Sequence, residues 1–350
     1  MRVGFHTAYR DDDLAHAALR LARFARELGY DVSIRSHHPG RCKVDRDWDS
    51  RVELEADRSF GEWVKSCRVV VWTEPGPAEL IAAAARVGAK TVVLLPWDFL
   101  GTSFQAFYRS ADVLVSPVKE GATVLKENWP DARVKFVPWD VGLPPTRKPA
   151  PKDPSRVRVL FPVHGWQSGR VCPDVLTVVY RLMSALDHVD VTFLYNHKAV
   201  GTDGLKAVRR LAAKFGDRFE PLSDKGMSRD RVLVEYAAAD LTAWASEFEG
   251  LGRVGLESLA MGTPVVAYDV PPQSEFLKDR CNAVLVPCEL KYTTTGVPIV
   301  NPNPAEFGKA LEDVCSRPRE LSDMRRSVRY GLADRLARFK AGWKDIFSLR

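Results

Sequence analysis

The sequence predicts an α/β protein made of two doubly wound domains, each a parallel sheet covered by helices on both faces. Short apolar runs typical of buried strands alternate with amphipathic helical segments along most of the chain, which is the pattern of βαβ units. The chain has 350 residues, more than one ordinary hydrophobic core accommodates. A proline-rich segment near residue 150 separates two such alternating halves.

The first half alternates from its beginning. A helix is predicted over 14–28, where Leu14, Ala17, Ala18 and Leu21 recur at helical spacing before Gly29 ends it. A second helix is predicted over 78–87, and the charged segment 37–62 receives no assignment. Strands are predicted at 2–6, 31–35, 68–72, 90–95, 113–116 and 134–137.

The second half repeats this organisation after a linker. Residues 142–156 contain five prolines, a composition typical of an extended connection between domains. Beyond it, strands are expected at 157–161, 189–195, near 219, and at 241–245, 265–267 and 283–286. We expect helices over 173–186, 205–215 and 229–238, and only helices from 304 onward. The expected domains are 1–148 and 149–325, followed by a basic helical segment at 326–350.

Composition and charge restrict the class of protein. Hydrophobic residues make up 45% and charged residues 27%, values typical of globular proteins. No apolar run approaches the ~20 residues that span a bilayer, and the N-terminus lacks the apolar core of a secretory signal. We therefore expect a cytoplasmic protein without a transmembrane segment. Residues 317–350 carry ten basic and four acidic side chains, so this segment holds the whole net charge of +6.

That basic segment has two interpretations. It is either a solvated helical face or a patch that attracts a polyanion, meaning nucleic acid or an anionic membrane surface. The six cysteines form no CxxC pair and match no zinc spacing. The aspartate groups at 11–13 and 45–49 fall in loops or helix starts. We accordingly expect no metal site and no cofactor.

The stretch Ser246–Val266 carries the strongest functional signal. It follows a predicted strand and combines a glycine-rich turn, Gly250 to Gly252, with a short helix and another strand. This unit brings the N–H groups of a helix start to the carboxyl edge of a parallel sheet, where phosphates commonly bind. Glu249 lies just before the helix and Glu257 within it.

The same stretch resembles the signature of GT-B-fold retaining glycosyltransferases of the family-4 type. Their motif has two glutamates separated by seven residues, and residues 249–267 of this chain, EGLGRVGLESLAMGTPVVA, follow that pattern closely. Glu275 and the segment 282–287 resemble the next parts of the signature, with Ala283 in place of glycine. The resemblance covers the C-terminal half in detail. It implies two Rossmann-like domains facing across a cleft, with C-terminal helices crossing back to the first domain.

The resemblance also implies roles on the donor side. Glu257 would accept hydrogen bonds from ribose hydroxyls, Glu249 would contact the donor sugar near the reacting carbon, and the N–H groups of Gly250, Leu251 and Gly252 would approach the diphosphate. The basic pair of the family falls in residues 161–170. There Arg170 takes the place of a lysine as a catalytic cation, and His164 and Gln167 lie near the position of the family's arginine.

The acceptor side departs from the family. The first strand is followed by residues 6–10 without glycine, and Tyr9 is the acceptor-binding candidate there. Residues 96–100 carry no histidine, so Asp98 becomes the catalytic candidate and Trp97 and Phe99 the acceptor-binding ones. Aromatic residues at 97–108 either stack on a sugar or base or form core packing around one helix.

The resemblance therefore implies a retaining, metal-independent hexosyltransferase that uses a UDP- or GDP-sugar, with UDP favoured. Its acceptor is a membrane lipid or glycan, or a modified base in DNA, and the protein is then peripheral to a membrane or associated with DNA. Two alternatives stay open. One is a sugar-nucleotide 2-epimerase on the same fold, and the other is a protein that binds sugar nucleotides without catalysis.

Overall fold

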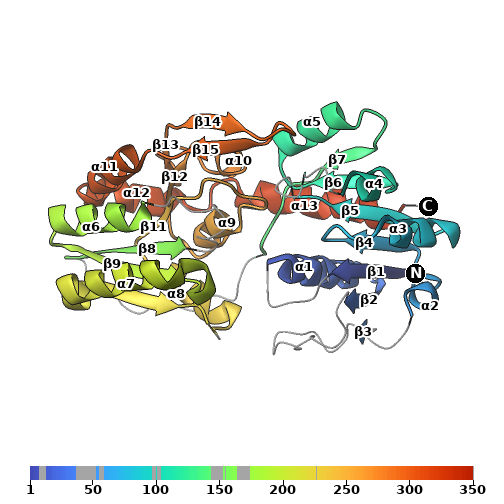
Figure 1. Cartoon of the computed structure of the whole chain (residues 1–350), viewed down its shortest axis with the longest axis horizontal. Coiled ribbons are helices and arrows are strands. Elements are labelled where there is room, and N and C mark those ends of the chain that lie inside the picture. Colours follow the sequence, from blue (N-terminus) through green and yellow to red (C-terminus); the bar gives the residue numbers. More distant parts are fainter. Residues whose placement is uncertain are drawn as a thin grey trace. The chain divides into compact units, whose positions relative to one another are not determined.

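The computed structural model divides into two compact units (Figure 1). It describes residues 1–7, 13–36, 53–54, 59–96, 100, 104–142, 153, 155–163, 174–225 and 227–349. Unit 1 comprises Met1–Asp140, Thr294–Val297 and Asp334–Arg350, and unit 2 comprises Val141–Thr293 and Pro298–Ala333. Each unit is an α/β domain with a parallel sheet, and the sequence prediction of two doubly wound domains is confirmed.

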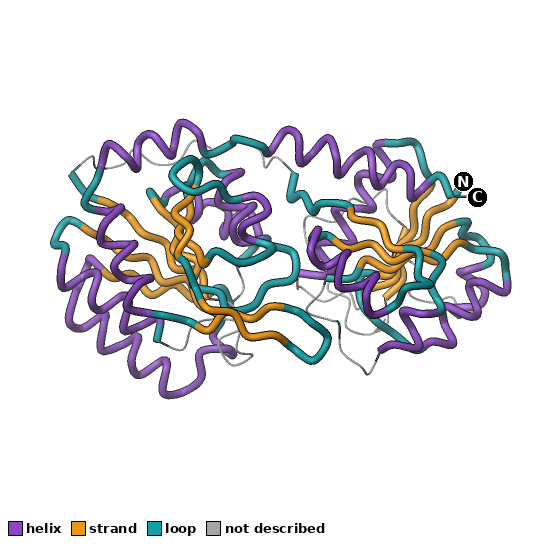
Figure 2. Tube along the Cα trace, turned by 90° about the horizontal axis from the view of Figure 1, so that it is seen from above, coloured by secondary structure: helices purple, strands orange, loops and turns teal. Residues whose placement is uncertain are grey.

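The sheet of unit 1 has the strand order β3-β2-β1-β4-β5-β6-β7, and every pair is parallel. Its central strands are apolar on both faces because helices cover both sides (Figure 2). The strands are β1 (Arg2–Thr7), β2 (Asp31–Ser36), β3 (Glu53–Leu54), β4 (Val69–Trp72), β5 (Lys90–Leu94), β6 (Val113–Ser116) and β7 (Val134–Phe136).

Two layers of helices flank this sheet. The aromatic residues of α13 meet β1 and α1 on one face: Phe347 packs edge-on against Phe5, and Phe339 packs at a tilt against Phe24. On the opposite face, Trp63 of α2 lies against His6. The helices are α1 (Asp13–Glu27), α2 (Phe60–Val64), α3 (Ala78–Arg86), α4 (Gln105–Arg109), α5 (Lys119–Asn128) and α13 (Leu332–Phe347).

The last helix is therefore part of the core of unit 1. Phe339, Trp343, Ile346 and Phe347 are fully buried, and burial of each such side chain contributes about 1.5–3 kcal/mol. Arg335 is 4% exposed, and its Nε donates to the carbonyl oxygen of Trp139 over 2.6 Å. The division between the units falls after Asp140 and before Asp334, whereas the sequence placed boundaries at 148 and 326.

The main sheet of unit 2 has the strand order β10-β9-β8-β11-β12-β13, again all parallel. A large core lies on the face covered by α6, α7, α11 and α12, and a smaller one under α8. The strands are β8 (Val157–Val163), β9 (Val189–Tyr195), β10 (Phe219–Ser223), β11 (Leu241–Trp244), β12 (Val265–Tyr268) and β13 (Ala283–Val286). The helices are α6 (Val175–Ala185), α7 (His197–Phe215), α8 (Arg229–Ala238), α9 (Arg253–Ala260), α10 (Gln273–Phe276), α11 (Pro304–Cys315) and α12 (Pro318–Ser327).

One hairpin has no counterpart in the sequence prediction. Strands β14 (Glu289–Tyr292) and β15 (Pro298–Asn301) pair antiparallel as a separate two-stranded sheet. All four residues of β14 are exposed, so this strand lacks the alternation that marks a half-buried strand. The hairpin tip, Thr294–Val297, belongs to unit 1, and the carbonyl of Thr295 accepts a hydrogen bond from the Asn128 side chain.

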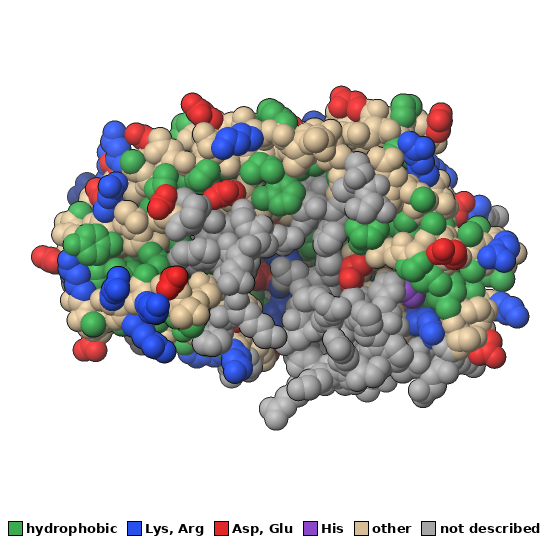
Figure 3. Space-filling view, viewed as in Figure 1, with side chains coloured by type: hydrophobic (Ala, Val, Ile, Leu, Met, Phe, Trp, Pro, Cys, Tyr) green, Lys and Arg blue, Asp and Glu red, His purple; other side chains and the backbone are tan. Residues whose placement is uncertain are grey.

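Some basic side chains of the C-terminal segment 317–350 form ion pairs with acidic residues of unit 2. Arg325 pairs with the buried carboxylate of Asp240, and Arg317 pairs at the surface with Asp313 and Glu320. Part of the C-terminal positive charge is thus neutralised by ion pairs within the fold or on its surface. On the face seen in Figure 3, Lys and Arg side chains gather at the lower left, where Figure 1 places α7 and α8.

Two of the aromatic residues expected at 97–108 belong to the core of unit 1. Phe107 and Tyr108 are 2% and 0% exposed and pack against Trp72 and Trp129. Of the two interpretations of this group, core packing therefore holds for these two residues. Phe104 remains 38% exposed.

Candidate functional site: the carboxyl edge of unit 2

The turn before α9 is shaped by a glycine that no other residue replaces without strain. Gly252 caps the helix in the left-handed conformation, with φ 71° and ψ 27°. A Cβ atom there would lie 2.8 Å from a ring carbon of Phe276. Both the dihedral angle and the space therefore require glycine. Helix α9 consequently begins at a close-packed turn beyond the carboxyl end of β11, and its first N–H groups lie at that turn.

Glu249 stands at the start of this turn. The N–H of Gly250 donates to Glu249 Oε1 over 3.2 Å, which holds the carboxylate beside the turn. Gly250 and Leu251 are buried, whereas Glu249 is partly exposed. The structure thus brings together Glu249, Gly250, Leu251 and Gly252 in one loop, as the sequence predicted from their adjacency.

Glu257 is anchored by two arginines. Its side chain is almost buried, and Oε1 accepts from Arg253 at 2.9 and 3.2 Å and from Arg229 at 3.1 Å. Arg253 is four residues before Glu257 on the same helix, a spacing that a sequence search can recognise. Arg229 opens α8 and lies 28 positions earlier, so sequence reasoning missed it. Two guanidinium groups beside a helix start favour an anionic ligand.

Buried hydroxyls hold α9 on the sheet. Ser258 Oγ lies 2.7 Å from Thr242 Oγ1 of β11 and 2.8 Å from the carbonyl oxygen of Thr263. Thr263 in turn donates to the carbonyl of Tyr236 over 2.6 Å. Gly255 lets the helix approach Trp244, since a Cβ atom there would lie 2.7 Å from that ring. Fixed side chains of this kind keep the helix start in one position.

Two further polar residues lie near the turn. Gln273 is 1% exposed, and neither amide atom has a hydrogen-bond partner within the described part of the chain. It opens α10, whose Phe276 contacts the turn at Gly252. Glu247 precedes Glu249 by two residues, and burial raises the pKa of its carboxyl, an effect that Lys291 opposes.

Seven of the residues expected in the site lie outside the described residues. They comprise three on the donor side and four on the acceptor side: His164, Gln167 and Arg170, and Tyr9, Trp97, Asp98 and Phe99.

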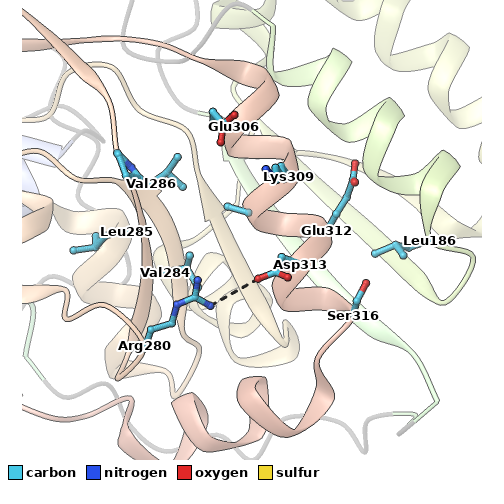
Figure 4. Close-up of a pocket in the computed structure, with 12 residues that line it drawn as sticks. Leu186, Arg280, Val284, Leu285, Val286, Glu306, Lys309, Glu312, Asp313 and Ser316 are labelled. Carbon is cyan, nitrogen blue, oxygen red and sulfur yellow. Dashed lines mark ion pairs between the residues drawn. The ribbon is translucent and has the colours of Figure 1, made fainter.

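A pocket of about 540 Å³ lies elsewhere in unit 2, between the edge strand β13 and α11 (Figure 4). Arg280, Lys309 and Asp313 line it, together with apolar residues of β13, and Arg280 pairs with Asp313 at 3.9 Å. Glu249, Glu257 and the glycine turn do not line this pocket. It is therefore separate from the site at the carboxyl edge.

Comparison with known proteins supports the class that fold and site suggest. Both units are Rossmann-like and together match the GT-B fold. The solved sucrose-phosphate synthase from Thermosynechococcus elongatus has a TM-score of 0.70 at 11% identity, covering 99% of this chain and 98% of the other. The Anabaena protein Alr3699/HepE, solved in complex with UDP-glucose, has a TM-score of 0.69 at 15% identity and full coverage of both chains.

The sequence matches point to a family within that fold. Residues 224–330 match the family described as "Glycosyl transferases group 1", a range that contains Glu249, Glu257 and both arginines. The D-inositol 3-phosphate glycosyltransferase of Xylanimonas cellulosilytica is 31% identical over 194 residues, which is 51% of this chain and 45% of that protein. The alignment thus spans less than half of that relative. Together these matches support a glycosyltransferase of the GT-B fold.

The structure gives one finding on membranes. Within the described part of the chain, no helix combines the length and the apolar composition that crossing a bilayer requires.

Proposed function

We propose that the protein is a retaining glycosyltransferase that moves a hexose from a nucleotide diphosphate sugar, with UDP as the favoured nucleotide and GDP as the alternative. The observation that carries this proposal is the anion-favouring site at the start of α9. There a glycine turn, Glu249 and an arginine-anchored Glu257 lie within the residues that match a glycosyltransferase family.

The chemistry follows from what each group offers. The N–H groups after Gly252 face a diphosphate and stabilise the charge that develops as it leaves. Arg253 and Arg229 add positive charge beside the same helix start, and they hold Glu257 where its carboxylate accepts hydrogen bonds from ribose hydroxyls. Glu249 contacts the donor sugar. In this proposal Arg170 also neutralises charge on the leaving diphosphate, a role that the family resemblance implies, and the transfer needs no metal ion.

The proposed acceptor is a molecule that carries a free hydroxyl group. A hydroxyl-bearing acceptor in a lipid headgroup or glycan agrees with the name of the D-inositol 3-phosphate glycosyltransferase of Xylanimonas cellulosilytica, since inositol phosphate carries ring hydroxyls. A modified base in DNA is the second acceptor class, and it would have to leave the base stack to react.

Donor recognition is tested first with the full chain. Thermal-shift titrations with UDP-, GDP- and ADP-glucose are expected to show stabilisation that is largest with the UDP-sugar. Release of UDP is then measured with and without acceptors. Binding without any release of UDP or any transfer would favour the non-catalytic alternative, and interconversion of the sugar at C2 would favour the epimerase.

Glu249→Ala supplies the decisive variant, because it removes the carboxylate that contacts the donor sugar. UDP release and sugar transfer that both persist undiminished in this variant would contradict the assignment. Glu289→Ala, an exposed change on β14, is the matched control.

A further inference from the structure

The two main sheets have the same strand order around their centres, so each loop of one sheet has a counterpart in the other. In unit 1 the chain order reverses between β1 and β4, and in unit 2 between β8 and β11. Ligands of open α/β sheets bind outside the carboxyl ends of the strands at such a reversal. In unit 2 the loop after β11 carries Glu249. The corresponding loop of unit 1 follows β4 and begins at Thr73.

That loop in unit 1 contains a carboxylate tied to the neighbouring strand. Thr7 is the last residue of β1, and its hydroxyl donates to Glu74 Oε1 over 3.0 Å. The strands stay aligned here, because the N–H of Thr73 donates to the carbonyl of His6 over 3.3 Å. The side chain of Glu74 therefore lies beside the carboxyl ends of both β1 and β4, and it is only partly buried.

A second observation at the same place, an unsatisfied buried hydroxyl group, also indicates a ligand. Thr7 and Thr73 are both 0% exposed. The hydroxyl of Thr73 has no hydrogen-bond partner within the described residues. Leaving a buried hydroxyl unsatisfied is unfavourable, and such groups concentrate where a ligand or water completes the bonding.

The backbone of this loop is restrained as well. Glu74 is followed by Pro75, Gly76 and Pro77, and Pro77 caps α3. A residue before proline is confined to extended conformations, and proline fixes its own φ angle. Glu74 thus projects from a stiff segment, which suits a residue that orients a ligand.

We propose that Glu74 binds a hydroxyl of the sugar acceptor and that Thr7 positions it, an inference that rests on the proposed glycosyl transfer. A carboxylate accepts hydrogen bonds from two neighbouring hydroxyls and repels phosphate groups. The part of the acceptor that reaches Glu74 is therefore a neutral polyol, such as a sugar or cyclitol ring. A DNA backbone does not fit this position, so the inference favours the glycan or lipid-headgroup class of acceptor.

Binding of polyols without any donor gives the first test. Saturation-transfer NMR on the full chain is run with D-inositol 3-phosphate, glucose and glycerol as probes. At least one probe is expected to bind the wild-type chain, with affinity at least tenfold lower in Glu74→Gln. Glu79→Gln, an exposed change on α3, is expected to match wild type. Equal binding by Glu74→Gln, or no binding of any probe to wild type, would overturn the proposal.

Kinetics give the second test, once a donor is known. The ratio of transfer to donor hydrolysis by water is expected to fall at least tenfold in Glu74→Gln, through a raised acceptor KM. A parallel fall of transfer and hydrolysis would overturn the role, since it would show a general structural defect.

Thr7 provides a variant that leaves the carboxylate in place. Thr7→Val is expected to raise the acceptor KM severalfold with little change in kcat, and Thr7→Ser to restore it. Equal KM values in all three proteins would contradict positioning by Thr7. Failure of the proposed function gives a different result, because the wild-type protein then binds no sugar nucleotide in the thermal-shift titrations. In that case the polyol titrations alone decide whether Glu74 binds a polyol.

Discussion

Units 1 and 2 arrange their central strands alike, as β2-β1-β4-β5-β6 and β9-β8-β11-β12-β13, yet the loops at their carboxyl edges differ in composition. The loop after β11 is glycine-rich and leads into a helix flanked by Arg229 and Arg253. The loop after β4 has prolines around its glycine and ties Glu74 to Thr7. The edge of unit 2 therefore offers N–H groups and two guanidinium groups beside the carboxylates of Glu249 and Glu257, whereas the edge of unit 1 offers a carboxylate beside hydroxyl groups.

Under the two proposals, this difference lets one topology serve two kinds of ligand. The strand order fixes where a ligand binds, because both reversals bring two loops together at the same edge. The loop residues then select the chemistry of that ligand, and the two proposals above assign an anionic diphosphate to unit 2 and a neutral polyol to unit 1. Function is carried by the site rather than by the fold.

The largest effect is expected at Glu249. Under this division Glu249→Gln lowers both donor hydrolysis and transfer, by about 10²-fold, the scale of one charged hydrogen bond of roughly 3 kcal/mol. UDP release with and without acceptor measures both. Glu247→Gln, two residues earlier, is expected to stay within threefold of wild type. A loss of transfer with unchanged donor hydrolysis would indicate that Glu249 acts on the acceptor, and it would contradict the division of roles between the two units.

Next comes the shape of the turn. Gly252→Ala forces a Cβ atom against Phe276 and a left-handed alanine, which together are expected to destabilise unit 2 by about 2–4 kcal/mol. Gly262→Ala is the matched control, since its φ is also positive at 89° but no atom lies within 4 Å of its Cβ position. It is expected to cost about 1–2 kcal/mol. Denaturant unfolding measures both, and equal losses would show that contact with Phe276 is unimportant.

Glu257 is expected to have a smaller effect, confined to donor affinity. Glu257→Gln keeps the side-chain shape but removes the charge that faces Arg229 and Arg253. UDP-glucose affinity, measured by calorimetry, is expected to fall about tenfold, or roughly 1.4 kcal/mol. Glu220→Gln, exposed on β10, serves as control. Unchanged affinity would make Glu257 an anchor for the arginines rather than a ligand of the ribose.

The smallest effect is the pH dependence from Glu247. Burial raises the pKa of this carboxyl above its ordinary value of 4.5, so the native state holds the proton more tightly than the unfolded chain. Stability contributed by this group therefore falls as pH rises from about 4.5 through the raised pKa. Glu247→Gln is expected to raise the Tm at pH 7 and leave it unchanged at pH 4. An equal shift at both pH values would point to a cause other than ionisation.

Local patterns were enough to predict most strands, most helices and the turn around Gly252, but β3 lies in the segment 37–62 that received no assignment. Valine-rich strands such as β4 and β12 are buried on both faces, and their apolar runs are visible in the sequence. The turn was predictable because Glu249, the glycines and α9 are contiguous. The hairpin β14–β15 was missed, since exposed residues such as Tyr292 leave no pattern of burial.

Contacts between distant segments could not be predicted in this way. Arg229 reaches Glu257 only because α8 and α9 pack side by side on the sheet, and Thr7 reaches Glu74 across 67 positions only because β1 and β4 are neighbours. The basic C-terminal segment suggested a surface patch, whereas Arg325 is paired with Asp240, 85 residues away. Such pairings depend on strand order, which periodicity does not encode.

The position of α13 in the chain has a consequence for synthesis. Unit 1 begins with the first residues but takes its final helix from residues after Asp334. A ribosome therefore completes every strand of unit 2 before it delivers Phe339 and Trp343, which close the core over β1 and α1. Domains usually fold in the order in which they emerge. Of the two units, unit 1 begins to emerge first but is completed last, and its apolar face lacks the cover of α13 until residues 332–347 are made.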